Sequence, residues 1–211
     1  MRAPLPAPLI LASASPQRKN LLRRLGVPFR VVPSGVSEKG KARSPGELAE
    51  ALARRKALFV AKKHPRALVL GADTLVFCRG RLIFKPKDRK DSLRILLILN
   101  GRRQEVFTGA ALAWEGGEMI LSGVERTLVY ARRLGDEALS RLAGKHMDKA
   151  GAYAVQDRDD PFIARIRGRR DNVIGLPLRL VRELLGRAGK SKRWSRGVRP
   201  TRRRSSPRGA R

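Results

Sequence analysis

The sequence predicts a single α/β domain, in which helices alternate with the strands of a sheet. Short apolar runs such as 8–12 and 67–71 are typical of buried strands. Segments with leucines at helical spacing lie between such runs, and two of them follow a serine that can cap a helix. Because the two patterns alternate as far as about residue 185, we expect one α/β domain rather than separate all-α and all-β parts.

The first part of the chain is expected to form a strand at 8–12, a helix at 16–25, a strand at 29–32 and a helix from 45 to about 62. Ser15 can cap the first helix, with Pro16 at its first position and Gly26 at its end. Ser44 and Glu47 have the spacing of a capping box for the second helix. These signals define a βαβ-like opening followed by a longer helix.

The remaining expected elements are a strand at 67–71 that resumes at 75–77, a helix around 93–97, strands at 105–114 and 119–129, a helix at 136–143, strands at 152–155 and 163–166, and a final helix at 177–185. The break at Gly71–Thr74 is expected because glycine and aspartate favour turns. This break would place Asp73 at the end of an apolar strand core.

The charge divides the chain into a domain at 1–189 and a basic tail at 190–211. The chain has 211 residues and a formal net charge of +30, from 48 Lys and Arg against 18 Asp and Glu. Ten of these cations and no acid lie in 190–211, so 30 minus 10 leaves +20 for the rest. The tail is also rich in Ser, Pro and Gly, which predicts disorder. Such a charge favours phosphates or nucleic acid as partners.

Cysteine content and hydropathy narrow the class of protein. Cys78 is the single cysteine of the sequence, which rules out an intrachain disulfide and a cysteine metal cluster. No apolar run reaches the roughly 18 residues of a membrane span, and the start lacks the apolar stretch of a signal peptide. We therefore expect a cytoplasmic protein that does not enter the membrane.

Two segments carry residues suited to phosphate chemistry. The run from Ser13 to Arg18 brings hydroxyls and a fixed cation to a helix N-terminus, where anions bind. An ordinary capped helix with a solvated arginine is the alternative. Asp73 emerges from an apolar run, where an ionised carboxylate needs a hydrogen bond, a partner cation or a metal. A turn aspartate bonded to its own backbone is the alternative there.

Five ordered motifs together resemble the Maf family of nucleoside triphosphate pyrophosphatases, over about residues 8–186. They are Leu-Ala-Ser-Ala-Ser-Pro-Gln-Arg at 11–18, Gly-Ala-Asp-Thr at 71–74, Phe-Lys-Pro-Lys-Asp at 84–88, Asp-Lys-Ala-Gly-Ala-Tyr-Ala-Val-Gln at 148–156 and Asn-Val-Ile-Gly-Leu-Pro-Leu at 172–178. The resemblance implies an α/β fold like that of inosine triphosphate pyrophosphatases, with a mixed sheet, flanking helices and two lobes around a cleft. It also implies a homodimer and hydrolysis of a nucleoside triphosphate to a monophosphate and pyrophosphate.

The resemblance also implies the site residues. Asp73 corresponds to the catalytic proton acceptor, and Glu38 with Asp73 is expected to hold a divalent cation, Mg²⁺ or Mn²⁺. The expected substrate-binding residues are Ser13, Gln17, Arg18, Lys56, Thr74, Lys85 and Gln156. This set suits the chemistry, because a triphosphate carries several negative charges that cations must neutralise.

Base preference is implied by three positions. Thr74 and Gln156 match the branch of the family that acts on dTTP and UTP. Gln17 departs from that branch, which has arginine there, so a permanent cation with five donors is replaced by a single amide.

Two other readings stay open. A nucleic-acid-binding protein would use the basic tail, although the ten aromatic residues suggest no stacking platform from the sequence. An inactive family member that acts only through interactions is the second, and the presence of every expected polar residue argues against it.

Overall fold

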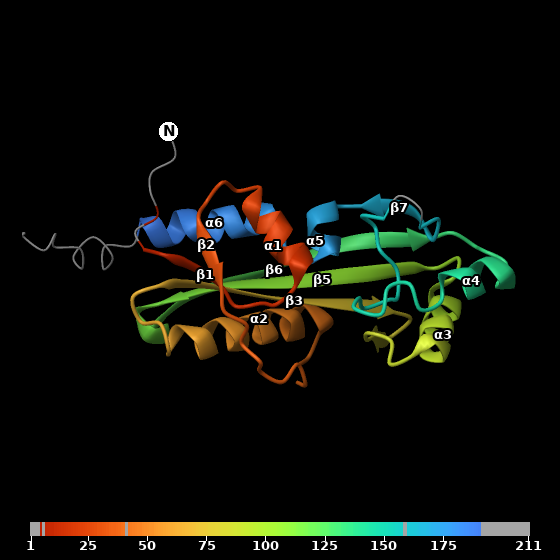
Figure 1. The fold of residues 1–211 in the computed structure, drawn as a ribbon, viewed down its shortest axis with the longest axis horizontal. Coiled ribbons are helices and arrows are strands. Elements are labelled where there is room, and N and C mark those ends of the chain that lie inside the picture. The colour runs from red at the N-terminus through yellow and green to blue at the C-terminus, as the bar shows by residue number, and fades with distance from the viewer. Residues whose placement is uncertain (1–4, 6, 41, 158–159, 191–211) are drawn as a thin grey trace, which may run out of the picture.

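A mixed sheet of long, twisted strands runs through the protein (Figure 1). In the computed structural model, which describes residues 5, 7–40, 42–157 and 160–190, this sheet has seven strands in the order β2-β1-β3-β5-β6-β7, with β4 paired to β3 outside this path. The strands are β1 (Leu9–Leu11), β2 (Phe29–Val31), β3 (Leu68–Cys78), β4 (Arg81–Ile83), β5 (Arg103–Trp114), β6 (Met119–Ala131) and β7 (Ile163–Arg167). The pairs β1–β2 and β1–β3 are parallel and the others antiparallel, which confirms the mixed α/β fold.

The helices are α1 (Pro16–Arg23), α2 (Pro45–Ala61), α3 (Arg89–Leu99), α4 (Asp136–Leu142), α5 (Arg170–Ile174) and α6 (Leu178–Gly189), with a 3-10 turn η1 at Glu115–Gly117. The two expected N-terminal caps are confirmed, whereas α1 ends at Arg23 with Arg24 as its C-terminal cap, before the expected Gly26. The Ser15 side chain accepts a hydrogen bond from the Arg18 backbone N–H, and that of Ser44 accepts one from the Glu47 N–H. None of the described helices is long and apolar enough to cross a membrane.

Alternation along the strands assigns each helix to one face of the sheet. Leu70 and Leu112 face the apolar core under α1 and α6, whereas Val69 and Ala111 face α2. The same face that carries α1 and α6 is covered by α3 and α4 at the other end of the long strands, where Val106 belongs to the core. In Figure 1, α2 runs below the sheet, α1 and α6 above it, and α3 and α4 lie at its right-hand end.

The expected break in the strand at 71–74 is wrong. β3 continues from Leu68 to Cys78, and residues 69–77 pair without interruption with β5. Gly71 serves helix packing rather than a turn, since a Cβ there would lie 2.3 Å from the Ala53 carbonyl oxygen of α2. Asp73 therefore lies inside a paired strand.

The expected strand at 152–155 is also wrong. Ala152 has a φ of 58°, which is incompatible with a strand, and the Ala154 N–H donates to the Asp160 carboxylate instead of to a neighbouring strand. The sequence reading also missed α5, which turns the chain just before α6. Residues 191–211 of the expected tail lie outside the described residues.

We expect Gly109→Ala to lower the free energy of unfolding by about 2 kcal/mol or more, because α2 lies directly on this part of β5. A Cβ at Gly109 would lie 2.3 Å from the backbone oxygen of Ala49. Urea denaturation measures the change. Gly186→Ala is the matched control: it has open space around it in α6 and should raise stability by up to about 1 kcal/mol. Equal stabilities for the two variants would contradict this packing.

Candidate active site

A cavity of about 470 Å³ opens where the start of α1, the middle of β3 and the loop after β2 meet. Every residue that the sequence reading selected as a site residue lies in its lining: Ser13, Gln17, Arg18, Glu38, Lys56, Asp73, Thr74, Lys85 and Gln156. These residues come from segments up to 143 positions apart, from position 13 to position 156. The fold thus brings the five motifs together around one space of the size that small-molecule sites have.

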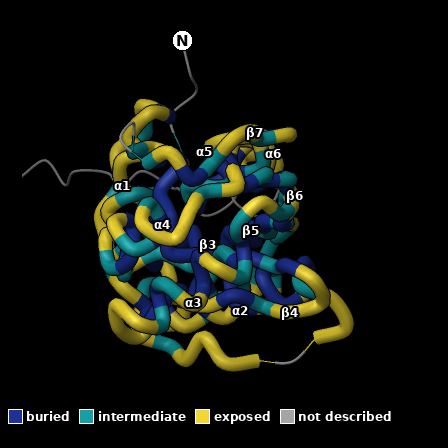
Figure 2. The backbone as a smooth tube through the Cα atoms, turned by 90° about the vertical axis from the view of Figure 1, so that its right-hand side faces the viewer, coloured by how far each residue is buried: buried dark blue, intermediate teal, exposed yellow. Residues whose placement is uncertain are grey.

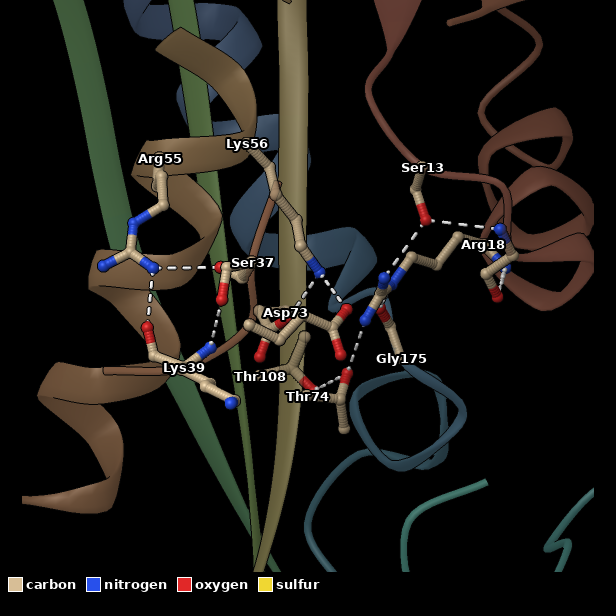
Figure 3. A network of polar contacts seen from close by, with 12 residues as sticks. Ser13, Arg18, Ser37, Lys39, Arg55, Lys56, Asp73, Thr74, Thr108 and Gly175 are labelled. Atoms are coloured by element: carbon tan, nitrogen blue, oxygen red, sulfur yellow. Dashed lines mark hydrogen bonds and ion pairs between the residues drawn. The ribbon is translucent and has the colours of Figure 1, made fainter. Parts of the chain in front are cut away.

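The centre of the cavity is an ion-pair chain (Figure 3). Lys56 projects from α2, and its Nζ donates to Asp73 Oδ1 at 2.5 Å and to Glu38 Oε1 at 2.6 Å. Lys56 and Asp73 are buried, with 5% and 4% of their surface exposed. The Glu38 side chain is 55% exposed. A buried carboxylate is thus connected through one ammonium group to a second carboxylate that faces solvent.

The environment shifts the two carboxyl groups in opposite directions. Burial raises the pKa of Asp73, although the neighbouring Lys56 and Arg18 favour its charged form. Burial also acts to raise the pKa of Glu38, but the hydrogen bond from Lys56 and the charges of Lys56, Lys85 and Arg18 lower it overall. Asp73 is therefore the stronger proton acceptor of the pair, and Glu38 stays ionised more readily.

Arg18 forms the second cationic element of the site (Figure 3). Its guanidinium donates from Nη1 to the Ser13 hydroxyl at 3.1 Å, from Nη2 to Thr74 Oγ1 at 3.2 Å, and from Nε to the Gly175 carbonyl at 2.9 Å. Burial lowers the pKa of Arg18, which Asp73 and Glu38 counteract. The Arg18 guanidinium thereby connects α1 to β3 and to the end of α5, and it places a positive charge beside Asp73.

Behind Thr74, a buried polar network fixes the strand positions. Thr74 Oγ1 lies 3.1 Å from Thr108 Oγ1 on the next strand, and the Thr108 hydroxyl donates to the Asn172 carbonyl at 2.8 Å. The Asn172 side-chain amide donates to the Val106 carbonyl and to the Thr127 hydroxyl. This explains the asparagine of the last motif: it connects α5 to the sheet rather than entering the cavity.

The cavity is also lined by residues that were not predicted from the sequence as site residues. The Gln17 amide donates to Asp148 Oδ2 at 3.2 Å, and Gln17 Oε1 accepts from the Ser15 hydroxyl. Lys149 beside Asp148, and the buried Ser34 and Tyr153, also line the cavity. Asp148 and Lys149 belong to the motif at 148–156, so the sequence could have indicated them as site residues. No motif in the sequence indicated Ser34.

Two of the predicted residues lie at the rim. Lys85 follows β4 and Gln156 follows the irregular segment after α4, and both are exposed. Lys85 is close enough to lower the pKa of Glu38. Their exposure leaves them free to contact a molecule in the cavity.

The donor atoms fit a cation that is shared with a ligand. No group of three or more His, Cys, Asp or Glu side chains suited to a metal occurs among the described residues. Glu38 and Asp73 supply two hard carboxylates to the same cavity. Mg²⁺ is commonly held by one or two carboxylates together with substrate phosphates, so this set suits a cation that binds along with a phosphorylated ligand.

Comparison with known proteins gives consistent matches over most of the chain. A family profile described as Maf-like protein matches residues 8–188. A protein named dTTP/UTP pyrophosphatase from Elusimicrobium minutum is 45% identical over 181 residues, which cover 86% of this chain and 98% of that protein. A protein of the same name from Deinococcus radiodurans is 43% identical, over 87% of this chain and 94% of its own length. One from Myxococcus xanthus is 43% identical, over 88% and 95%.

We expect Lys56→Met to destabilise the protein in a pH-dependent way, because it leaves Asp73 buried without its cation. The free energy of unfolding should fall by about 3 kcal/mol near pH 8. The loss should shrink as the pH falls, since a carboxyl with a raised native pKa opposes folding only where the unfolded state releases its proton. Denaturation at several pH values measures this. The exposed neighbour Lys62, changed to Met, is the control, and a loss for Lys56→Met that does not vary with pH would contradict the pairing.

Proposed function

The chain belongs to the Maf family, and we propose that it is a nucleoside triphosphate pyrophosphatase. In this reaction water attacks the α-phosphorus, and the products are a nucleoside monophosphate and pyrophosphate. The observation that carries the proposal is the placement of Asp73, a buried carboxylate of raised pKa that faces a cavity lined with cations.

Asp73 is proposed as the proton acceptor for the attacking water. A general base must have a pKa close enough to the working pH to take a proton in the transition state, and burial moves Asp73 in that direction. Its Oδ1 is engaged by Lys56, so its second oxygen is the atom that would hold the water. The neighbouring Lys56 ammonium stabilises the carboxylate in its basic form before attack.

The cations of the cavity are proposed to bind the phosphates. Arg18 is anchored by Ser13 and Thr74 at the N-terminal end of α1, where helix N–H groups also favour anions. Lys85 projects at the rim, and Lys56 lies next to the proton acceptor. Such preorganised charges stabilise the negative charge that develops during phosphoryl transfer.

A divalent cation, Mg²⁺ or Mn²⁺, is proposed as the cofactor. Glu38 and Asp73 would hold it together with phosphate oxygens, and its chemistry would be to neutralise and polarise the phosphates. The Lys56 ammonium occupies the space between these two carboxylates, so it marks a position where positive charge is stable. The half-exposed Glu38 can reorient toward an entering cation at little cost.

The proposed substrates are dTTP, UTP or modified pyrimidine nucleotides. The relatives carry dTTP/UTP pyrophosphatase as their name, and Thr74 and Gln156 match that branch. Gln17 departs from it and bonds Asp148 across the mouth of the cavity. We therefore propose a looser base preference than that of enzymes with arginine at this position.

Two further proposals concern the state of the protein. A cytoplasmic enzyme fits a chain with one buried free cysteine, Cys78, and a homodimer is expected from the family. Contact of the tail at 190–211 with nucleic acid remains a prediction from its charge.

An inactive family member is the weaker alternative to the proposed activity. The predicted polar residues all line one cavity: Ser13, Arg18, Glu38, Lys56, Asp73 and Lys85.

The proposed activity is tested by incubating the protein with Mg²⁺ or Mn²⁺ and a panel of dTTP, UTP, CTP, GTP and 7-methyl-GTP, with products separated by chromatography. We expect monophosphate and pyrophosphate, at a rate that Asp73→Asn lowers by about 10²-fold or more. Chelation of the cation should abolish turnover reversibly. The exposed Asp136, changed to Asn, is the control. A diphosphate product, or an Asp73→Asn variant within about threefold of the wild type, would reject the proposal.

Base preference is tested with Gln17→Arg. Arginine at this position adds a cation opposite Asp148 and restores the five-donor fork of the dTTP/UTP branch. We expect the kcat/KM ratio of dTTP to CTP to rise by about tenfold, because one added contact to the substrate discriminates between substrates at roughly this level. An unchanged ranking of the panel would show that position 17 does not select the base.

A further inference from the structure

The end of the sheet that lies beyond α2, formed by the first residues of β5 and the last residues of β6, has one covered face and one open face. On the covered face, Gln104, Val106, Thr127 and Val129 are buried, with at most 1% of their surface exposed. On the opposite face, the alternating positions of β5 and β6 are exposed or only partly buried along the whole stretch. In an antiparallel sheet this alternation means that one side packs on a core and the other meets solvent.

The described helices leave this face uncovered. α2 covers the other half of the same face as far as Phe107, which packs against the α2 residues Leu48, Ala49 and Leu52. Near the start of α2, a Cβ at Gly46 would lie 3.4 Å from Phe107 and 3.8 Å from Val124. α3 and α4 pack on the opposite side, with Val106 and Val129. In Figure 2, α3 and α4 lie to the left of β5, and β6 lies to its right. We call the uncovered side of β5, β6 and β7 the open sheet face; it comprises Arg103, Glu105, Arg126, Leu128, Tyr130, Arg165 and Arg167.

Strand pairing arranges this face in rows of arginine and apolar side chains. Arg103, Tyr130 and Arg165 stand opposite one another across the three strands. The Arg165 guanidinium lies 4.5 Å from the centre of the Tyr130 ring, which is a cation–π contact. In the next row the partly exposed Leu128 lies beside the exposed Arg167. The face therefore offers the flat ring of Tyr130 next to fixed positive charges.

The charge of the open sheet face is strongly positive. Arg103, Arg126, Arg165 and Arg167 are all exposed. Glu105 is the acid among the described residues of this face, and it is bonded to Arg126 at 2.7 Å. In the part of the chain that the structure describes, the other three guanidinium groups have no bonded acid on the face. A second copy of the same face would bring like charges together in a chain of net charge +30. A polyanion is the complementary partner.

We propose that the open sheet face binds single-stranded nucleic acid. Exposed bases can stack on Tyr130 and on the planar guanidinium of Arg165, while the arginine rows contact phosphates. The bases of a duplex are already stacked on one another, so their faces are not available to the Tyr130 ring. No residue of the open sheet face lines the catalytic cavity, so single-stranded nucleic acid and a nucleotide substrate can bind at the same time. This site is distinct from any contact made by the tail.

The test is fluorescence anisotropy of a labelled oligothymidylate of about twenty nucleotides, titrated with the full chain at several salt concentrations. The variant Arg165→Gln/Arg167→Gln should bind at least tenfold more weakly. For this variant, the slope of log K against log salt concentration should become shallower by about 1.4, since each phosphate contact on a single strand contributes about 0.7 to the slope. Tyr130→Ala should weaken binding fivefold or more with little change in salt dependence, because stacking carries no charge.

The matched control is Arg23→Gln/Arg182→Gln, which removes the same charge from α1 and α6 on the opposite side of the sheet. Residues 191–211 stay in every variant, so their contribution is common to all. The control should bind within about twofold of the wild type. Equal losses for both double variants would overturn the proposal in favour of general attraction by net charge or tail. Tighter binding of a duplex of the same length, or a face variant that turns a dimer into a monomer in sedimentation, would also overturn it.

Discussion

The ion pair between Lys56 and Asp73 is the contact on which the arrangement of the site depends. An ionised carboxylate inside a paired strand is unfavourable without a partner. The partner reaches it because Gly71 and Gly109 let α2 lie directly on β3 and β5, which directs the Lys56 side chain along the sheet to Asp73. The close packing of α2 on the sheet is therefore also what places the Lys56 ammonium beside Asp73. A bulkier residue at either glycine would displace the ammonium from the carboxylate it stabilises.

Arg18 plays the corresponding part on the other side of Asp73. Its three hydrogen bonds connect α1, β3 and the end of α5, and the buried Asn172 network fixes α5 against the sheet. The positive charges that face the cavity are thus held by contacts within the fold before any ligand arrives. Preorganised charge of this kind needs no rearrangement when negative charge develops on a substrate. By contrast, Glu38 and Lys85 lie in more exposed positions, where they can adjust to what binds.

The sequence carried most of the information on elements and little on how they meet. Caps such as Ser15 and Ser44 could be predicted because their signals are local. The continuity of β3 could not, since a Gly-Ala-Asp-Thr segment resembles a turn until its partner strands are known. The pairing of Lys56 with Glu38 and the bridge from Gln17 to Asp148 depend on tertiary contacts. The open sheet face was missed for the same reason, because only strand register places scattered aromatic and arginine residues in common rows.

Attack of water on the α-phosphorus beside Asp73 is the central claim, and the fate of the water oxygen tests it most directly. Hydrolysis of dTTP in water labelled with oxygen-18, followed by mass spectrometry of both products, shows which phosphorus is attacked. The account predicts that the label appears in the monophosphate and that the pyrophosphate stays unlabelled. Label in the pyrophosphate would place the attack on the β-phosphorus and contradict the role assigned to Asp73.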